Sequence, residues 1–199
     1  MQQLLKQDYT LTIYTENQVG LINKIAIIFS KRKLNIESFN SSPSEVKGIF
    51  RFTMVIHETE AVVKKVCKQI EKQIDILRAY YNTDDEIIWQ EMALYKMPTS
   101  VTTEHIKVER LLRQHGARAV VIRNDYTIFE ATGQREETDN LLAVLQPLGL
   151  IEFVRSARIA IIKNSDGLHS KVLNFEAKQP SDDTSTNEFL NDQDEVFTM

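Results

Sequence analysis

The sequence predicts an α+β fold built from two tandem ferredoxin-like βαββαβ units followed by a polar tail. The order strand, helix, strand, strand, helix, strand occurs between residues 9 and 80 and recurs between residues 87 and 162. The two halves share this order without sharing residue identities, and the polar, charged stretch 82–86 lies between them. We therefore expect one domain at 1–82, a second at 83–165 and an acidic tail at 166–199.

The periodicity of apolar side chains assigns the elements of the first unit. Residues 9–14 alternate apolar and polar positions and are rich in β-branched and aromatic types, which is typical of a strand. Apolar residues then recur at helical spacing from Leu21 to Phe29, and the cations at 31–33 suit the negative end of a helix dipole. The remaining strands are expected at 34–39, 48–56 and 74–80. The second helix is expected at 59–73, with an inward stripe made of Val62, Val63, Val66, Cys67, Ile70 and Ile74.

The second unit shows the same periodicities. We expect strands at 87–97, 118–123, 126–132 and 150–162 and helices at 104–115 and 135–148. Trp89 anchors either the first strand of this unit or an interface, and the sequence leaves both possibilities open. Arg155 and Arg158 fall in the last strand without an assignable role.

Apolar side chains occur on both faces of the first sheet. Leu11 and Ile13 face away from Tyr14, and Phe52 and Met54 face away from Val55. A sheet that water wets on one face alternates more cleanly. We therefore expect a homodimer that pairs helices or strand edges.

Composition excludes several classes of protein. The chain has 199 residues, of which 42% are hydrophobic and 26% charged, as in ordinary soluble globular proteins. It has no apolar run long enough for a membrane span and no signal-like start, so we expect a cytoplasmic location. One cysteine and four scattered histidines supply neither a disulfide nor a metal cluster. Gly-rich phosphate loops, GxSxG and HExxH are also missing from the sequence.

Charge is concentrated at the carboxyl end. Seven acids and one lysine give residues 176–199 a charge of −6, whereas the whole chain carries −4, so the rest carries about +2. Nucleic-acid-binding domains are usually clearly basic. A stretch at 47–52 is similar to an RNA-recognition strand, but Ile49 and Arg51 occupy the positions where that module stacks bases on aromatic rings. We therefore expect no nucleic-acid partner, and we expect the segment from 165 onward to be disordered.

The turn between the first strand and the first helix is the best candidate for a binding site. Free backbone N–H groups at a helix start favour a carboxylate. Gly20 lets a ligand approach the backbone without a Cβ in the way. Asn17 offers an amide oxygen and an NH₂ group, which suit an ammonium and a carboxylate respectively. These groups match a free amino acid. The alternative is that Asn17 forms the turn or caps the helix and that Gly20 only fits a tight turn.

Two runs in the first unit carry a family resemblance. The segments Glu-Asn-Gln-Val-Gly-Leu at 16–21 and Phe-Ser-Lys-Arg-Lys-Leu-Asn-Ile-Glu-Ser at 29–38 resemble an ACT domain. More narrowly, they resemble the regulatory small subunits of acetolactate synthase (acetohydroxyacid synthase). The most specific motif is Asn-Ile-Glu-Ser at 35–38. Runs at 69–77, 90–94 and 152–156 support this resemblance, which spans 9–163 and therefore both units.

The resemblance implies a regulatory role. Such a chain performs no chemistry and binds no cofactor or metal itself. It binds and activates the catalytic large subunit, a transferase that uses thiamine diphosphate, Mg²⁺ and FAD in the biosynthesis of valine, leucine and isoleucine. It also confers feedback inhibition by valine or a related amino acid. The alternative is a stand-alone ACT-type amino-acid sensor that acts on another enzyme or on transcription.

The resemblance also implies where the effector binds, namely at the interface of two paired ACT domains in a homodimer. Asn17 and Gly20 of one protomer would face Asn35 of the other. The remaining implied site residues are two that supply neighbouring backbone N–H groups and one that lines the site: Val19, Leu21 and Ile36. The sequence departs from the family at position 33, where Lys33 stands in place of a common glycine, and in a shorter connection at 42–48. We expect the turn before Asn35 to differ for that reason.

Overall fold

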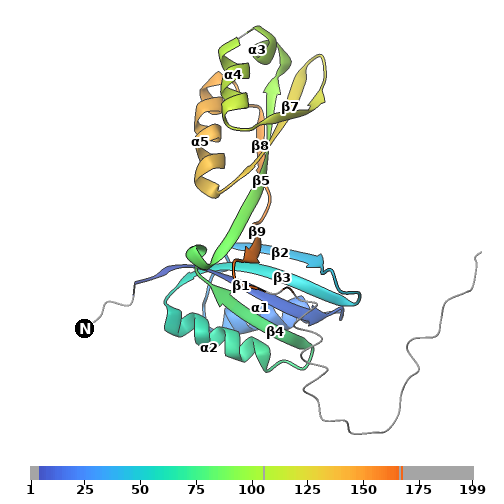
Figure 1. Cartoon of the computed structure of the whole chain (residues 1–199), viewed down its shortest axis with the longest axis vertical. Helices are drawn as coiled ribbons and strands as arrows, with labels where there is room; N and C mark the ends of the chain where they lie inside the picture. Colours follow the sequence, from blue (N-terminus) through green and yellow to red (C-terminus); the bar gives the residue numbers. More distant parts are fainter. Residues whose placement is uncertain (1–4, 105, 166, 168–199) are drawn as a thin grey trace, which may run out of the picture. The chain divides into compact units, whose positions relative to one another are not determined.

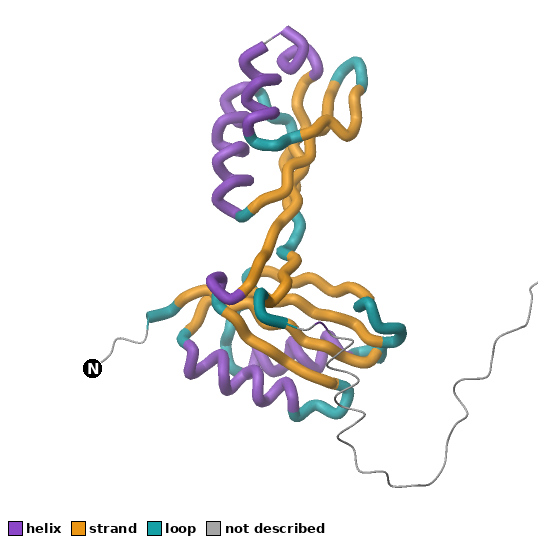
Figure 2. The backbone as a smooth tube through the Cα atoms, in the orientation of Figure 1, coloured by secondary structure: helices purple, strands orange, loops and turns teal. Residues whose placement is uncertain are grey.

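The computed structural model describes residues 5–104, 106–165 and 167. The chain divides into two units, Met1–Ser165 and Asp166–Met199, and every element discussed below lies in the first. The expected α+β fold with two tandem βαββαβ sheets is confirmed (Figures 1 and 2). The segment from 168 onward, for which we expected disorder, lies outside the described residues.

The first sheet is antiparallel, with strand order β2-β3-β1-β4, and two helices cover one of its faces (Figure 1). Its elements are β1 Gln7–Glu16, α1 Leu21–Lys31, β2 Ser38–Pro43, β3 Ile49–Glu58, α2 Glu60–Glu71 and β4 Ile76–Asn82. Alternate residues of β1 and β3 point at the helices and form the core together with the buried stripes of α1 and α2. Leu11, Ile13 and Ile56 are completely buried there.

The expected stripe of the second helix is wrong at its last member. Helix α2 ends at Glu71, and the backbone N–H groups of Lys72 and Gln73 both bond back to the carbonyl of Ile70. The turn that follows leaves the Ile74 side chain 98% exposed, whereas Ile70 is fully buried. The spacing of apolar residues predicted that the stripe continues to Ile74, but the helix ends at Glu71.

The second sheet has strand order β6-β7-β5-β8. Its elements are η1 Asp84–Glu86, β5 Ile87–Pro98, α3 Thr99–Glu104, α4 Ile106–Gln114, β6 Arg118–Ile122, β7 Tyr126–Gly133, α5 Arg135–Leu145, η2 Gln146–Leu148, β8 Glu152–Arg155 and β9 Ile159–Ile162. The single strand expected at 150–162 is therefore two strands, and the helix expected at 104–115 is α4 preceded by the separate α3. The break between β8 and β9 is held by Ser156, which bonds the backbone of Met92 through both its N–H and its hydroxyl.

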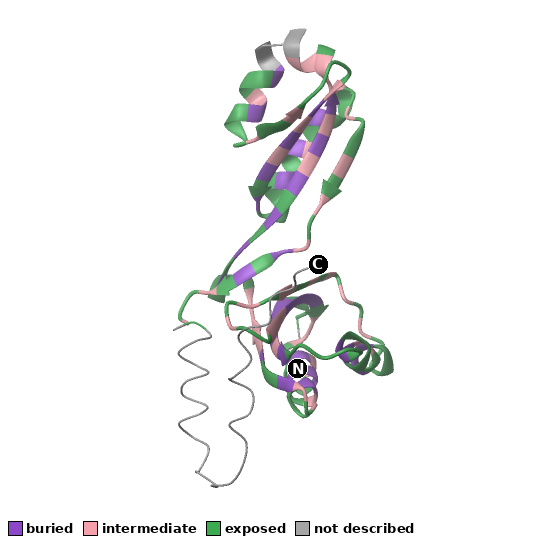
Figure 3. Cartoon of the chain, turned by 90° about the vertical axis from the view of Figure 1, so that its right-hand side faces the viewer, coloured by how far each residue is buried: buried purple, intermediate pink, exposed green. Residues whose placement is uncertain are grey.

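Strand β5 serves two sheets. Its first four residues pair with β9, from Ile87 opposite Ile162 to Gln90 opposite Ile159, whereas the rest pairs with β7 and β8. We call the paired residues 87–90 and 159–162 the ribbon. Alternate β5 residues are buried along the whole strand (Figure 3), including Trp89, which clusters with Ile87 and Ala160. Trp89 thus anchors the ribbon, which settles the choice that the sequence left open.

The second face of the first sheet is already covered within this chain. Thr53 and Val55 point away from the helices, yet each is only 3% exposed. The ribbon lies on this face in Figure 1. The burial of Val55 therefore requires no second protomer, and the argument for a dimer has to come from another surface. No helix within the described ranges is long and apolar enough to cross a membrane.

The contrast between Ile70 and Ile74 gives a direct test of the core. We expect Ile70→Ala to lower the free energy of unfolding by about 2–5 kcal/mol, because it leaves a cavity under α2. Ile74→Ala is the matched control and should change the free energy by less than about 0.5 kcal/mol, because its side chain is in water. Urea unfolding followed by circular dichroism measures both. Equal losses for the two variants would contradict the assigned end of α2.

Candidate functional site

The loop between β1 and α1 presents an uncapped helix start. The structure gives Gly20 as the N-cap of α1, with φ 84° and no side-chain cap hydrogen bond. The alternative in which Asn17 caps this helix is therefore wrong. The first turn of α1 also lacks an acidic residue. Its backbone N–H groups and the positive end of the helix dipole thus remain available to an anionic group.

Backbone hydrogen bonds fix the loop from both sides. The N–H of Glu16 bonds the carbonyl of Asp75 at 3.2 Å, and the N–H of Asn17 bonds the carbonyl of Gly48 at 3.1 Å. Lys24 on α1 forms an ion pair with Asp75 at 2.5 Å. The loop is exposed to solvent, but its β1 end is tied to the residue before β3 and to the turn before β4, and Lys24 ties α1 to that same turn. A ligand therefore meets a preset arrangement of the loop.

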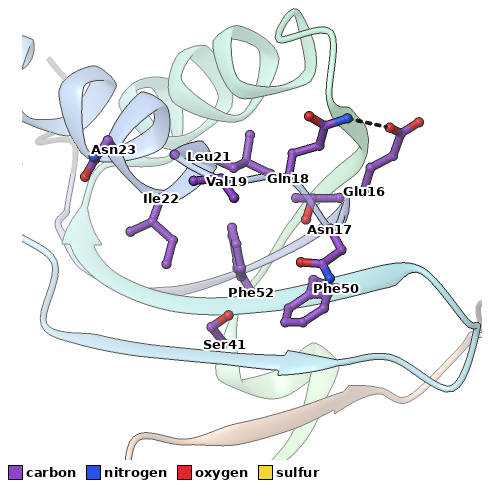
Figure 4. Close-up of a pocket in the computed structure, with 12 residues that line it drawn as sticks. Glu16, Asn17, Gln18, Val19, Leu21, Ile22, Asn23, Ser41, Phe50 and Phe52 are labelled. Atoms are coloured by element: carbon purple, nitrogen blue, oxygen red, sulfur yellow. Dashed lines mark hydrogen bonds between the residues drawn. The ribbon is translucent and has the colours of Figure 1, made fainter. Parts of the chain in front are cut away.

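A cavity of about 410 Å³ opens beside this loop (Figure 4). Its rim is polar and includes Asn17, whose amide points over the ring of Phe50. Its floor is apolar and is formed by Ile22, Phe50 and Phe52. Gln18 and Glu16 bond each other at 3.4 Å on the outer side of the loop. The combination of helix N–H groups, one amide and an apolar floor can hold a carboxylate, an ammonium group and an aliphatic side chain.

The expected site residues do not all come together in one chain. The residues of the loop and helix start, Asn17, Val19, Gly20 and Leu21, line the cavity. Ile36 lines a neighbouring apolar cavity of about 300 Å³, which shares Ile22 and Phe52 with the first. Asn35 is exposed, lies outside the lining of both cavities, and donates a hydrogen bond to Glu37 Oε1 at 2.7 Å.

The turn before Asn35 keeps the geometry that a glycine would have. Lys33 has φ 54°, the left-handed value usually found for glycine at the end of a helix. Its N–H bonds the carbonyl of Ser30, and the N–H of Leu34 bonds the carbonyl of Phe29, each at 3.0 Å. This pair of bonds is a Schellman motif. Lys33 therefore takes up backbone strain that a glycine would not carry, and a difference from the family's turn stays a prediction.

The sequence did not identify Phe50 and Phe52 as site residues. The pairing of Thr15 with Phe50 brings the beginning of β3 beside the end of β1, directly under the loop. Phe52 is 4% exposed and serves both the core and the cavity. Only the β1–β3 register reveals this role, and no local sequence signal carries it.

Cys67 does not act as a nucleophile in this arrangement. Its thiol is buried and donates to the carbonyl of Ala79 at 3.2 Å. Burial, and to a lesser degree the nearby Glu71 carboxylate, raise its pKa to about 11, so the thiol is protonated near neutral pH. Across the residues the structure describes, no three His, Cys, Asp or Glu side chains gather in a way that could hold a metal ion.

Fold and cavity together define an ACT-domain protein with a second ferredoxin-like unit. The family model described as an AHAS small subunit-like ACT domain matches residues 11–78, and the model described as small subunit of acetolactate synthase matches residues 90–164. The acetolactate synthase small subunit of Bacillus subtilis is 31% identical over 162 residues, covering 81% of this chain and 92% of that protein. The chain belongs to the acetolactate synthase small-subunit family, whose members are regulatory subunits.

Two further comparisons agree with this assignment. The acetolactate synthase small subunit of Mycolicibacterium smegmatis is 28% identical over 162 residues, covering 80% of this chain and 94% of that protein. The crystal structure of the acetolactate synthase small subunit from Thermotoga maritima has the same fold. Its TM-score is 0.72 at 19% identity, and the match covers 80% of this chain and 99% of that one.

The backbone geometry of Gly20 and Lys33 predicts opposite effects on stability. Gly20→Ala should lower the free energy of unfolding by about 1–2 kcal/mol, because a Cβ disfavours the left-handed conformation even where space is open. Lys33→Gly should raise it by up to about 1 kcal/mol, because it removes the same strain. Urea unfolding of the two variants beside wild type measures both. The same sign for both changes would contradict the assigned backbone conformations.

Proposed function

We propose that this chain is the regulatory subunit of acetolactate synthase in branched-chain amino acid biosynthesis. It binds and activates the catalytic large subunit in the cytoplasm and confers feedback inhibition by valine or a related amino acid. The ACT regulatory domain is residues 1–82, and the C-terminal ferredoxin-like domain is residues 83–165. The chain carries out no chemistry, and the large subunit supplies thiamine diphosphate, Mg²⁺ and FAD. The observation that carries the proposal is the uncapped start of α1 above an apolar cavity, in a chain of this family.

The cavity suits a small aliphatic amino acid. The carboxylate lies against the N–H groups at the start of α1, where backbone donors and the helix dipole act together. Asn17 orients the ammonium or carboxylate group from the rim. The aliphatic side chain lies on Ile22 and Phe52, which continue into the second cavity beside Ile36. Burying an aliphatic group on this floor favours valine, leucine and isoleucine over polar amino acids.

An exposed apolar edge supports pairing of two ACT domains. Strand β2 is at the edge of the first sheet, and Phe39 on it is 37% exposed. On the adjacent α1, Ile22 and Ile27 are half exposed, and Val19 is fully exposed in the loop. Edge strands and apolar patches of this kind are usually covered by a partner. A second copy on this edge brings its Asn35 toward the loop of the first, which completes a site that one chain leaves open.

Inhibition then follows from linkage. A ligand shifts an equilibrium only by the difference in its affinity for the two states. Valine therefore inhibits if the pair of ACT domains binds it more tightly in the less active arrangement of the complex. A coupling free energy of about 1–3 kcal/mol is typical for such effects. The alternative of a stand-alone amino-acid sensor is less well supported, because the family match extends over the second unit as well.

Reconstitution tests the proposal. The chain is mixed with the thiamine-diphosphate-dependent synthase of the same genome, and the activity is titrated separately with valine, leucine and isoleucine. We expect the chain to raise the activity and at least one of these amino acids to lower it with saturation. A synthase that runs equally well without this chain, and that none of the three amino acids inhibits, would contradict the proposal.

The shared site predicts the effect of two single substitutions. Asn17→Ala and Asn35→Ala should each raise the inhibition constant for valine about tenfold, as expected for the loss of one good hydrogen bond. Activation of the catalytic subunit should persist, because neither residue packs in a core. Asn124→Ala, in the exposed turn between β6 and β7, is the matched control. Unchanged inhibition constants in both site variants would remove these residues from the effector site.

A further inference from the structure

Arg158 is a buried cation that joins three distant segments of the chain. It lies between β8 and β9, and the whole residue is only 3% exposed. Its Nη1 donates to Thr10 Oγ1 on β1 at 3.1 Å and to Asp84 Oδ1 on η1 at 2.8 Å. Its Cζ lies 3.7 Å from the centre of the Trp89 ring on β5. We call these four residues the clasp.

The clasp gives the buried guanidinium one opposite charge, one hydroxyl and one aromatic face, whereas its Nε is buried without a hydrogen-bond partner among the described residues. A buried charge is tolerated only when it is paired and hydrogen-bonded. Asp84 supplies the opposite charge but is 44% exposed, so water also solvates it. The buried contacts are the face of Trp89 and the hydroxyl of Thr10, and a planar guanidinium makes both kinds of contact at once. Arg158 therefore contacts β1, η1 and β5 at the same time.

Strands β1 and β5 connect the clasp to two different parts of the molecule, namely the loop of the effector cavity and the second sheet. Strand β1 runs from Thr10 to Glu16 and ends in the loop of the effector cavity, a span of about 20 Å at the usual rise per residue. It is paired on both sides, with β3 and β4, and these pairings connect its loop end to Thr10, although the register with β4 shifts between Tyr14 and Thr15. Strand β5 runs from Trp89 out of the ribbon and becomes the central strand of the second sheet.

We infer that Arg158 is a positioning residue that transmits the effector-bound state of β1 to β5 through Thr10 and Trp89. This inference rests on the proposed function, since it needs an effector at the end of β1. A contact that is the same in the effector-free and effector-bound subunits would stabilise the fold but would not couple effector binding to inhibition. A transmitting contact changes when the effector binds, and its loss separates effector binding from inhibition.

The chain contains its own reporter for this test. Trp89 is the only tryptophan among the 199 residues, and Arg158 lies against its ring. The intrinsic tryptophan fluorescence of the purified full-length subunit therefore reports the surroundings of Trp89, which include the Arg158 guanidinium. Valine is titrated into the subunit while the emission is recorded, and a parallel calorimetric titration measures binding. We expect the emission to change and to saturate, and we expect its midpoint to fall at the same valine concentration as the midpoint of the calorimetric titration.

The matched variants separate transmission from packing. Thr10→Val removes only the hydroxyl that Arg158 bonds, and Thr12→Val makes the same change on the same face of β1. We expect Thr10→Val to keep the heat of binding but to lose at least about half of the emission change, and Thr12→Val to match wild type. In the reconstituted enzyme, Thr10→Val should need about fivefold more valine for half-inhibition, the lower end of typical allosteric coupling. Arg158→Lys, which keeps the charge but not the planar stack, should behave like Thr10→Val.

The outcomes are distinguishable. Heat of binding without any change in wild-type emission overturns the inference and leaves the proposed function standing. If valine inhibits Thr10→Val, Arg158→Lys and wild type equally, the inference is also overturned and the proposed function still stands. Absence of both heat and emission change with valine, leucine and isoleucine overturns the proposed function and the inference together. A saturable emission change that Thr10→Val abolishes, with binding retained, supports both.

Discussion

The start of α1 imposes the constraint on which the regulatory account depends. Gly20 takes a left-handed conformation, no side chain caps the helix, and the first turn carries no acid. The backbone N–H groups there keep their hydrogen-bonding capacity for an anion from outside the chain. A side-chain cap in place of this glycine would stabilise the helix by only a few tenths of a kcal/mol and would compete with a bound carboxylate. The loop therefore favours a ligand over local stability.

In the proposed site, selectivity comes from the shape of the cavity. Phe50 and Phe52 reach it because β3 pairs with β1 in a register that places Phe50 beside Thr15. The helix start attracts any small carboxylate, whereas the apolar floor favours one with an aliphatic side chain. The edge formed by β2 and α1 remains apolar and exposed in the single chain, and Asn35 lies near that edge instead of in the cavity. A second protomer is therefore part of the proposed site.

Much of the fold was predictable because each unit obeys local rules. The spacing of Leu21, Ile25 and Phe29 indicates a helix, and the alternation in β1 and β3 indicates half-buried strands. The errors fall where a turn overrides the pattern. Ile74 continues a helical stripe after the helix has ended, and Ser156 breaks one long apolar stretch into β8 and β9. Local hydrogen bonds to the carbonyl of Ile70 end the helix before Ile74, whereas the break at Ser156 is held by the distant backbone of Met92, which no sequence window contains.

The residues of the candidate site also fall into those that the sequence predicts and those that only the structure reveals. Asn17 and Gly20 lie in one short segment, so their chemistry was evident from the sequence. The role of Phe52 depends on strand register, and the role of Arg158 depends on Thr10 and Asp84, which are 148 and 74 residues away. Such contacts leave no periodicity to detect. The resemblance to the family covered these positions without assigning them a role, so only the structure brings them together.

The central claim is that the effector site is shared between two protomers, and mixed dimers test it most directly. Asn17→Ala and Asn35→Ala subunits are co-expressed with different affinity tags, and the heterodimer is isolated and titrated with valine by calorimetry. A shared site leaves one pocket with both asparagines intact, so we expect half the wild-type number of sites, with wild-type affinity. A heterodimer that binds valine no better than the two mutant homodimers would place each site within a single protomer and contradict the account.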